Sequence, residues 1–293
     1  MKIGLVTCLK IPEPDPDEEI QLEAIRQAGG EASLVAWDDS SVDLSRFDRL
    51  ILRSCWDYPW RQSEFSEWLD HADGQTQLLN PLAVVKWNLH KGYLLELARA
   101  GVPVVPTRIL PAGQGFAALE QILAEEQWCS DQWCSDPGGQ IVIKPAVSAG
   151  SWLTARFGPA ELTGAKTFVE QHGIDRDLLV QPYIRSVENG GERANVHIAG
   201  QWSHCVAKSP RFSGSDEQVG IAQPVLAEDL ELGEMAIACS PGKILYGRVD
   251  TVRNDEGQPM VAELELIEPT LFLKENPAAR ALFGAACVVP SCS

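Results

Sequence analysis

The sequence predicts an α/β (α+β) protein, in which a small parallel sheet with its helices is followed by a part rich in antiparallel strands. Two observations lead to this prediction. The N-terminal segment alternates apolar strand, amphipathic helix and apolar strand, which is the order of a parallel α/β unit. The second half contains several short strand-like segments separated by glycine-bearing turns. A length of 293 residues has room for about two domains.

The N-terminal elements follow one another in a βαβ order. The opening KIGLVT is predicted to be a buried strand, and the proline-rich IPEPDPDEE after it must be a loop because proline cannot donate to a sheet ladder. A helix is expected from Asp17, where Ile20, Leu22 and Ile25 recur at helical spacing before Gly29. Two further strands, EASLVAW and RLILRS, complete the predicted small sheet.

The middle of the chain is predicted to begin with a helix over Asn88–Ala100, at a domain junction, because leucines recur there before Gly101 and Pro103. Then follow the segment VPVVPT, a helix over Phe116–Glu126 and the strand QIVIKP, which contains Lys144 near its end. Between the last two lies a tandem repeat, QWCSDQWCSD (Gln127–Asp136). We interpret it as an exposed inserted loop, with a redox or metal role as the alternative.

The second half reads as five strands, listed here in order: LLVQPYI, ERANVHIAG, QWSHCVAK, KILYGRVDTVR and PMVAELELIE. The last two are expected to form an antiparallel hairpin around the turn at residues 254–257. The segment Ser209–Gly233 has no clear period, and long segments of this kind often serve as lids or binding loops.

Composition excludes several classes of function. A formal charge of −17 argues against a nucleic-acid partner, which would need a positive surface, although a single nucleotide remains possible. No segment is apolar for the roughly 18 residues that a membrane span needs, and no secretory leader is evident, so a cytoplasmic protein is expected. The eight cysteines are scattered, which favours free thiols. A homodimer is possible, because it is the commonest oligomer among soluble proteins, but no feature of the sequence indicates one.

Three carboxylates form the strongest chemical pattern in the sequence. Glu263 and Glu265 are two residues apart on one predicted strand and therefore share a face, and the hairpin allows Asp250 to lie opposite them. Converging carboxylates repel one another unless a cation is present, and oxygen ligands without His or Cys suit Mg²⁺ or Mn²⁺. The alternative is a solvated polar face of the hairpin.

Cations recur in the same part of the chain. Lys144 and Lys208 each lie at the end of a predicted strand, and Arg248 precedes Asp250 by two residues. Such side chains can bind phosphate oxygens, although each alone is more often a surface residue. The small residues of PAVSAGS, among them Ser148 and Gly150, would let backbone N–H groups approach a phosphate.

Taken in order, the segments IVIKPAVSAGS, LLVQPYI, GERANVHIAGQWSHCVAKSPR, GRVDTVR and VAELELIEP resemble the ATP-grasp ligases. The resemblance is to the glutathione-synthetase and RimK-like branch, and within it to the D-cycloserine-synthase-like (O-ureido-serine cyclo-ligase) group, from about Trp56 to the end. It implies an N-terminal pre-ATP-grasp α/β domain (residues 1–86), a central lobe (87–180) and a C-terminal lobe with the metal site (181–293), the two α+β lobes holding ATP between them.

The resemblance also implies roles for single residues. Lys91 and Lys144 would embrace the nucleotide phosphates, and Asp250, Glu263 and Glu265 would bind Mg²⁺ (or Mn²⁺). Glu188 would reach the ribose, and Arg193 and Lys208, with Arg248, would face the transferring phosphoryl group. The residues that would meet adenine are Gln181, Pro182, Tyr183 and Ile184.

The segment RSCWDYPWRQSEF resembles the family's substrate-side region. Arg53 and Arg61 could clamp a carboxylate, and Trp56, Asp57 and Tyr58 could shape the pocket and hold an amine; a loop with aromatic packing is the alternative. His204 is either a packing residue or a substrate contact.

After Lys208 the related group has a Gly-Asp-Phe-Arg type substrate loop. Here SPRFSGSDEQVG stands, with Arg211 its only cation, so the identity of the substrate is left open.

The function expected from these residues is ATP-dependent C–N ligation. ATP would phosphorylate the carboxylate of a small amino-acid-like substrate, and an amine would attack the acyl phosphate, releasing ADP and phosphate. The amine could belong to a second molecule or to the same one, which would then cyclise. A small-molecule kinase and a non-catalytic nucleotide-binding module are the alternatives.

Overall fold

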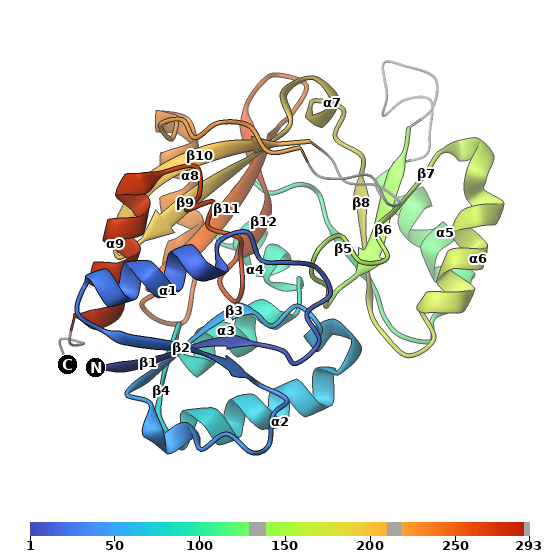
Figure 1. Cartoon of the computed structure of the whole chain (residues 1–293). Coiled ribbons are helices and arrows are strands. Elements are labelled where there is room, and N and C mark those ends of the chain that lie inside the picture. The colour runs from blue at the N-terminus through green and yellow to red at the C-terminus, as the bar shows by residue number, and fades with distance from the viewer. Residues whose placement is uncertain (129–138, 210–217, 290–293) are drawn as a thin grey trace.

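The computed structural model describes residues 1–128, 139–209 and 218–289, which form three four-stranded sheets with helices around them (Figure 1). The first sheet is parallel with the order β2-β1-β3-β4. Its strands are β1 (Lys2–Thr7), β2 (Glu31–Ala36), β3 (Arg49–Ser54) and β4 (Gln77–Leu79), and α1 (Glu18–Gln27) and α2 (Gln62–Asp73) connect them. The predicted parallel βαβ beginning is confirmed.

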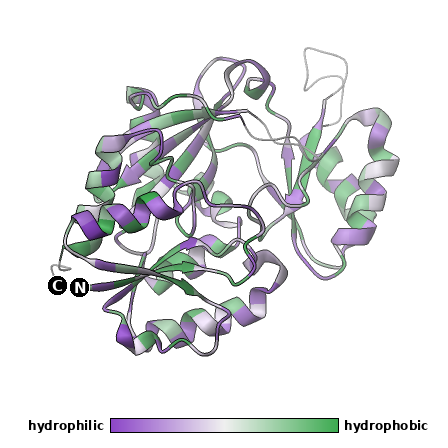
Figure 2. Cartoon of the chain, in the orientation of Figure 1, coloured by the Kyte–Doolittle hydropathy of each residue, from purple (hydrophilic) through white to green (hydrophobic). Residues whose placement is uncertain are grey.

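The second sheet is antiparallel and lies in a lobe of its own, at the right of Figure 1. Its order is β5-β8-β6-β7. The strands are β5 (Arg108–Leu110), β6 (Ile141–Pro145), β7 (Ala155–Phe157) and β8 (Leu178–Pro182), and the helices α5 (Gly115–Glu126) and α6 (Leu162–His172) pack on them. Figure 2 shows hydrophobic residues where these helices meet the sheet and hydrophilic residues on their outer turns.

The third sheet is antiparallel with the order β10-β9-β11-β12. Its strands are β9 (Glu192–Ile198), β10 (Gln201–Lys208), β11 (Tyr246–Arg253) and β12 (Pro259–Glu265), and the predicted hairpin of the last two is confirmed. The short α7 (Val187–Gly190) precedes this sheet, α8 (Ala227–Ala238) packs on it, and α9 (Pro277–Val288) lies against α1.

The helix predicted over Asn88–Ala100 is wrong as one continuous element. The structure has two helices, α3 (Leu82–Leu89) and α4 (Tyr93–Arg99), because His90 is extended and interrupts the ladder. Asn88 lies in the last turn of the first helix, and its side chain bonds to the backbone at the end of β12: its amide donates to the Leu264 carbonyl and its oxygen accepts from the Leu266 N–H, both at 2.8 Å. Tertiary hydrogen bonds thus override the local helical pattern.

Two other predictions about loops need correction. Trp128, at the start of the tandem repeat, is buried in the core of the second lobe rather than exposed, and residues 129–136 of the repeat lie outside the described residues. The segment Ser209–Gly233, which was predicted to be without clear period and typical of a lid or binding loop, contains the beginning of α8, in which Gly233 fits against the Trp202 ring because it has no side chain.

The cores show how the sheets are joined. One core combines residues of β1 and α1 with residues of β9, β11 and α9, whereas the second lobe has a separate core of its own. Among the described residues, no helix combines the length and the apolar character that crossing a bilayer would require.

Candidate active site

A cavity of about 510 Å³ lies where the three sheets meet. It is lined by residues of the loop after β3, the break between α3 and α4, the loop after β6, the segment after β8, and the strands β11 and β12. Of the residues predicted from the sequence, it brings together Trp56, Tyr58, Lys91, Lys144, Ser148, Gly150, Gln181, Pro182, Tyr183, Ile184, Lys208, Arg248, Asp250, Glu263 and Glu265.

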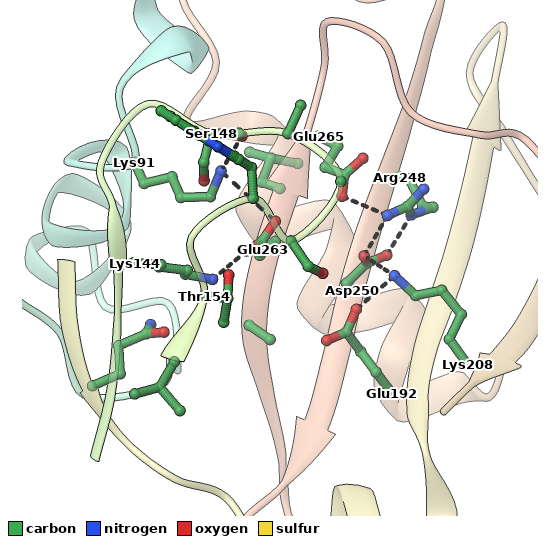
Figure 3. Close-up of a pocket in the computed structure, with 18 of the residues that line it drawn as sticks. Lys91, Lys144, Ser148, Thr154, Glu192, Lys208, Arg248, Asp250, Glu263 and Glu265 are labelled. Atoms are coloured by element: carbon green, nitrogen blue, oxygen red, sulfur yellow. Dashed lines mark hydrogen bonds and ion pairs between the residues drawn. The ribbon is translucent and has the colours of Figure 1, made fainter. Parts of the chain in front are cut away.

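Lys91 and Lys144 reach the cavity from different elements and meet at one carboxylate, that of Glu263 (Figure 3). Lys144 forms an ion pair with Glu263 Oε1, and Lys91 Nζ lies 3.9 Å from Oε2 while donating to the Ser148 carbonyl at 2.8 Å. The break before α4 positions Lys91, whose backbone N–H donates to the Ala146 carbonyl at 2.7 Å. Burial acts to raise the pKa of Glu263, but the two ammonium groups outweigh it and hold that pKa at about 2.

The register of the hairpin places the three predicted carboxylates side by side. In the register of β11 and β12, Asp250 lies opposite Glu263 and Arg248 lies opposite Glu265. Asp250 accepts hydrogen bonds from Arg248 Nε at 2.7 Å and from Lys208 Nζ at 2.8 Å. Burial alone would raise the pKa of Asp250, but these two cations hold it below its usual range. The period-2 argument therefore identified the correct face of β12.

Glu192 is a cavity residue that the sequence analysis missed. Its carboxylate lies 2.7 Å from Lys208 Nζ, and burial raises its pKa to about 7 against the opposing charge of Lys208. The pKa of Glu265 is likewise raised to about 7, first by burial, with Arg248 opposing and the Asp250 charge adding to the rise. The position of Glu192 could have been predicted from the β9–β10 hairpin, because the turn at Ala199–Gly200 was visible in the sequence and the register of this hairpin places Glu192 opposite Lys208.

The donor chemistry of this site fits a hard divalent cation, since the acidic side chains offer only oxygen atoms. Within the described part of the chain, however, no three His, Cys, Asp or Glu residues gather around one point at ligand distance. Each carboxylate is instead ion-paired, Glu263 with the two lysines, and Asp250 and Glu265 with Arg248.

The predicted adenine segment lies on the cavity wall, but Glu188 does not. The Gln181 amide donates to Thr107 Oγ1 at 2.9 Å, which fixes this segment against the second lobe's first strand. Glu188 is exposed, accepts from the Tyr183 hydroxyl at 3.0 Å and pairs with Arg156 at 3.2 Å. The structure therefore gives Glu188 a contact beside the cavity and not within it.

Arg193 faces away from the cavity, contrary to its predicted position. Successive residues of a strand point to opposite sides, so that Glu192 lines the cavity while Arg193 pairs with Asp229 of α8 at 2.9 Å. Asp229 also pairs with Arg253 at 2.8 Å. Arg193 is thus part of an ion-pair network that attaches α8 to the sheet.

Of the predicted substrate residues near β3, the cavity contains the aromatic ones only. Arg53 is buried elsewhere, with its guanidinium 4.8 Å from the Tyr246 ring centroid. Arg61 pairs with Asp38 at 2.7 Å and with Asp57 at 3.1 Å, and neither it nor Asp57 lines the cavity. The predicted arginine clamp is absent from the cavity, because tertiary contacts hold both guanidinium groups outside it.

The alternative reading of His204 as a packing residue agrees with its position. It is 2 % exposed, lies outside the cavity lining and has Nδ1 3.0 Å from Ser203 Oγ. Burial lowers its pKa, so the ring is neutral at pH 7. Arg211 lies outside the described residues. Trp60, Glu13 and Glu268 line the cavity and were not singled out, since no local pattern distinguishes them.

Comparison with known proteins places this fold and cavity in a defined class. A family model described as the N-terminal domain of D-cycloserine synthetase DcsG matches residues 3–80. The cycloserine biosynthesis protein DcsG of Streptomyces lavendulae is 31 % identical over 292 residues, covering 92 % of each chain.

Solved structures of related proteins lead to the same class. The crystal structure of D-cycloserine synthetase DcsG matches with a TM-score of 0.87 and 30 % identity over 98 % of both chains. A RimK domain ATP-grasp protein from Sphaerobacter thermophilus shares the fold, with a TM-score of 0.65 and 18 % identity over 98 % of both chains.

The three-sheet architecture with a cavity of lysines and carboxylates is therefore that of an ATP-grasp ligase, and the protein is an enzyme. Within that class, the chain belongs to the D-cycloserine synthetase DcsG family. The fold class and the resemblance inferred from the sequence are both confirmed.

Proposed function

We propose that this enzyme closes a ring within one amino-acid-like substrate, by ATP-dependent formation of a C–N bond between its carboxylate and its own amine, in the cytoplasm. The observation that carries the proposal is the single cavity into which Lys91 and Lys144, Arg248 and Lys208, and three carboxylates all project. The choice of cyclisation over the joining of two molecules is supported by relatives whose names describe cycloserine synthesis.

The first step is phosphoryl transfer. A carboxylate oxygen of the substrate attacks the γ-phosphorus of ATP, the bond from that phosphorus to the β-phosphate oxygen breaks, and ADP leaves. Such a transfer needs positioning and positive charge more than covalent help. Lys91 and Lys144 hold the phosphates, exchanging Glu263 for phosphate oxygens, while Arg248 and Lys208 offset the charge on the transferring group.

In the second step the amine attacks the acyl carbon, the bond to the phosphate oxygen breaks, and inorganic phosphate leaves with the amine's proton. The cavity favours this outcome over hydrolysis because its wall is formed by packed side chains, among them Trp56, Tyr58 and Tyr93.

Asp250, Glu263 and Glu265 would hold a divalent cation, Mg²⁺ by the preference of oxygen donors, which when bound would neutralise phosphate charge. In this structure the same carboxylates are ion-paired with Lys144 and Arg248.

The test is ADP release with Mg²⁺-ATP against single amino acids, pairs of amino acids, and ureido and aminooxy amino acids, with product masses recorded. Cyclisation predicts stimulation by one compound alone and a product lighter than that compound, with no added second substrate. A requirement for two compounds, with a product that contains both, would favour intermolecular ligation. Stable phosphorylated substrate would indicate a kinase instead.

A further inference from the structure

Glu268 differs from the other acidic residues of β12 and its neighbours on the cavity wall. Glu192, Asp250, Glu263 and Glu265 are each ion-paired with lysine or arginine. None of the ion pairs between described residues involves Glu268, although its side chain lines the same cavity. A partly buried carboxylate without a cationic partner is costly unless a ligand supplies one.

The backbone that carries Glu268 is held in place on both sides. The Trp56 indole N–H donates to the Glu268 carbonyl at 3.1 Å. The Tyr246 hydroxyl donates to the carbonyl of the preceding Ile267 at 2.7 Å. These donors fix the backbone directly after β12, and the Glu268 side chain starts from a defined point on the cavity wall.

The surroundings of this carboxylate are aromatic. The buried Tyr58 side chain lies beside it, and the Tyr58 ring stacks on Phe65 with centroids 5.0 Å apart. Burial raises the pKa of Glu268, and Tyr58 and the charges of Lys91 and Arg53 oppose that rise. Trp56 lines the cavity beside them. A carboxylate between aromatic rings is an arrangement that recognises a small organic cation, through charge and through the ring faces.

We propose that Glu268 is the residue that determines specificity for the substrate's free α-ammonium group, with Trp56 and Tyr58 as the walls of that subsite. This inference rests on the proposed function, in which the substrate is amino-acid-like. It places recognition of the α-ammonium group directly after β12, the strand that carries Glu263 and Glu265. The proposed cation-binding residues and the proposed ammonium-binding residue would then belong to one continuous segment.

The experiment compares two compounds and measures ADP release with Mg²⁺-ATP. The compounds are O-ureido-serine and the analogue in which hydrogen replaces the α-amine. The wild-type enzyme is expected to prefer the amine-bearing compound by roughly 10–100-fold in kcat/KM, the range for a hydrogen bond between charged groups. In Glu268→Gln this preference falls to less than about threefold, mainly through a higher KM, because a neutral amide keeps the size of the side chain but does not attract the ammonium.

Tyr58→Phe keeps the ring and removes the polar group next to Glu268, so an intermediate preference is expected. Glu120→Gln, the same chemical change on the exposed face of α5, is the matched control and retains the wild-type preference. The KM for ATP reports whether each variant still binds the nucleotide. If Glu268→Gln no longer binds ATP, the substrate preference of Tyr58→Phe is used instead to test the proposed subsite.

If Glu268→Gln keeps the wild-type preference, the proposed subsite is refuted and the proposed ligase activity is not affected. The same conclusion follows if Tyr58→Phe keeps that preference when Glu268→Gln no longer binds ATP. Wild-type enzyme that releases no ADP with any amino-acid-like compound in the panel refutes the proposed function itself, and this inference with it.

Discussion

Replacement of Lys144 by alanine removes the ammonium that pairs with Glu263 at the cavity wall. A unit charge about 4 Å from a phosphate oxygen contributes about 4 kcal/mol at an effective dielectric constant of about 20. Lys91 remains and compensates in part, so we expect a loss of about 3–4 kcal/mol in transition-state stabilisation, or roughly a 10²–10³-fold lower kcat/KM for ATP.

The same variant should be less stable without nucleotide. The pKa of Glu263 lies at about 2 against an ordinary 4.5, which corresponds to about 3 kcal/mol of stability at neutral pH that is lost as pH falls through the folded value. Lys144 is the largest of the attractive causes, and both side chains are mostly buried, 12 % and 21 % exposed. A decrease of about 1–2 kcal/mol in unfolding free energy at pH 7 is therefore expected for Lys144→Ala.

Steady-state ADP release and urea denaturation at pH 7 measure the two effects. Lys166→Ala is the matched control, because Lys166 lies on α6 of the same lobe, is 51 % exposed and pairs only with Glu170, at 3.8 Å, among the described residues. It should change neither quantity. ATP turnover within about threefold of wild type in Lys144→Ala would refute the assignment of the phosphate site.

Three further predictions concern other parts of the molecule. Glu263→Gln should abolish metal-dependent turnover while binding of the protein to ATP without metal persists, as measured by equilibrium dialysis. Arg61→Ala should leave the KM for every substrate unchanged but lower the unfolding free energy by about 1 kcal/mol, because its guanidinium lies 4.3 Å from the Trp37 ring centroid and outside the cavity. Burial holds the pKa of His197 below 6.5, so this ring by itself lowers the unfolding free energy as pH drops from 7 to 5, whereas the raised pKa values of Glu192 and Glu265 act in the opposite direction. In denaturation series His197→Phe should therefore be more stable at pH 5, relative to pH 7, than the wild type is.

Each of these has an outcome that contradicts it. Wild-type metal-dependent activity in the Glu263 variant would remove this residue from the cation site. A raised substrate KM in Arg61→Ala would return that arginine to the substrate pocket, as the sequence alone suggested. An unchanged pH slope in the His197 variant would show that this ring is protonated equally in the folded and unfolded chains.

The parts of the site that were predictable from the sequence depend on local geometry. The face shared by Glu263 and Glu265 follows from strand periodicity, and the position of Asp250 follows from the hairpin. The segments with Lys91 and Lys144 were located by their resemblance to a family, and the comparisons confirm that family. Strand periodicity thus located the carboxylates, and the resemblance located the lysine segments.

The incorrect predictions about the site concern side chains whose direction is set by partners outside the local sequence pattern. Arg193 was assigned to the cavity, but the alternation of β9 gives that place to Glu192, and Asp229 on α8 holds the arginine on the other side. Arg61 likewise pairs with Asp38, which is far from it in the sequence. No single-sequence pattern encodes such pairings, because they arise only when separate elements pack together.

The distribution of the cores relates the three sheets unequally. The first and third sheets share buried residues, whereas the lobe of β5–β8 has a core of its own and joins the third sheet through Leu179 and Ile109. Lys91 precedes α4, which packs in a core with β12, while Lys144 belongs to the separate lobe. The two lysines proposed to bind phosphate therefore come from different lobes. A polyanion bound between them would attract both, so the ligand's own charge would help to hold the two lobes together.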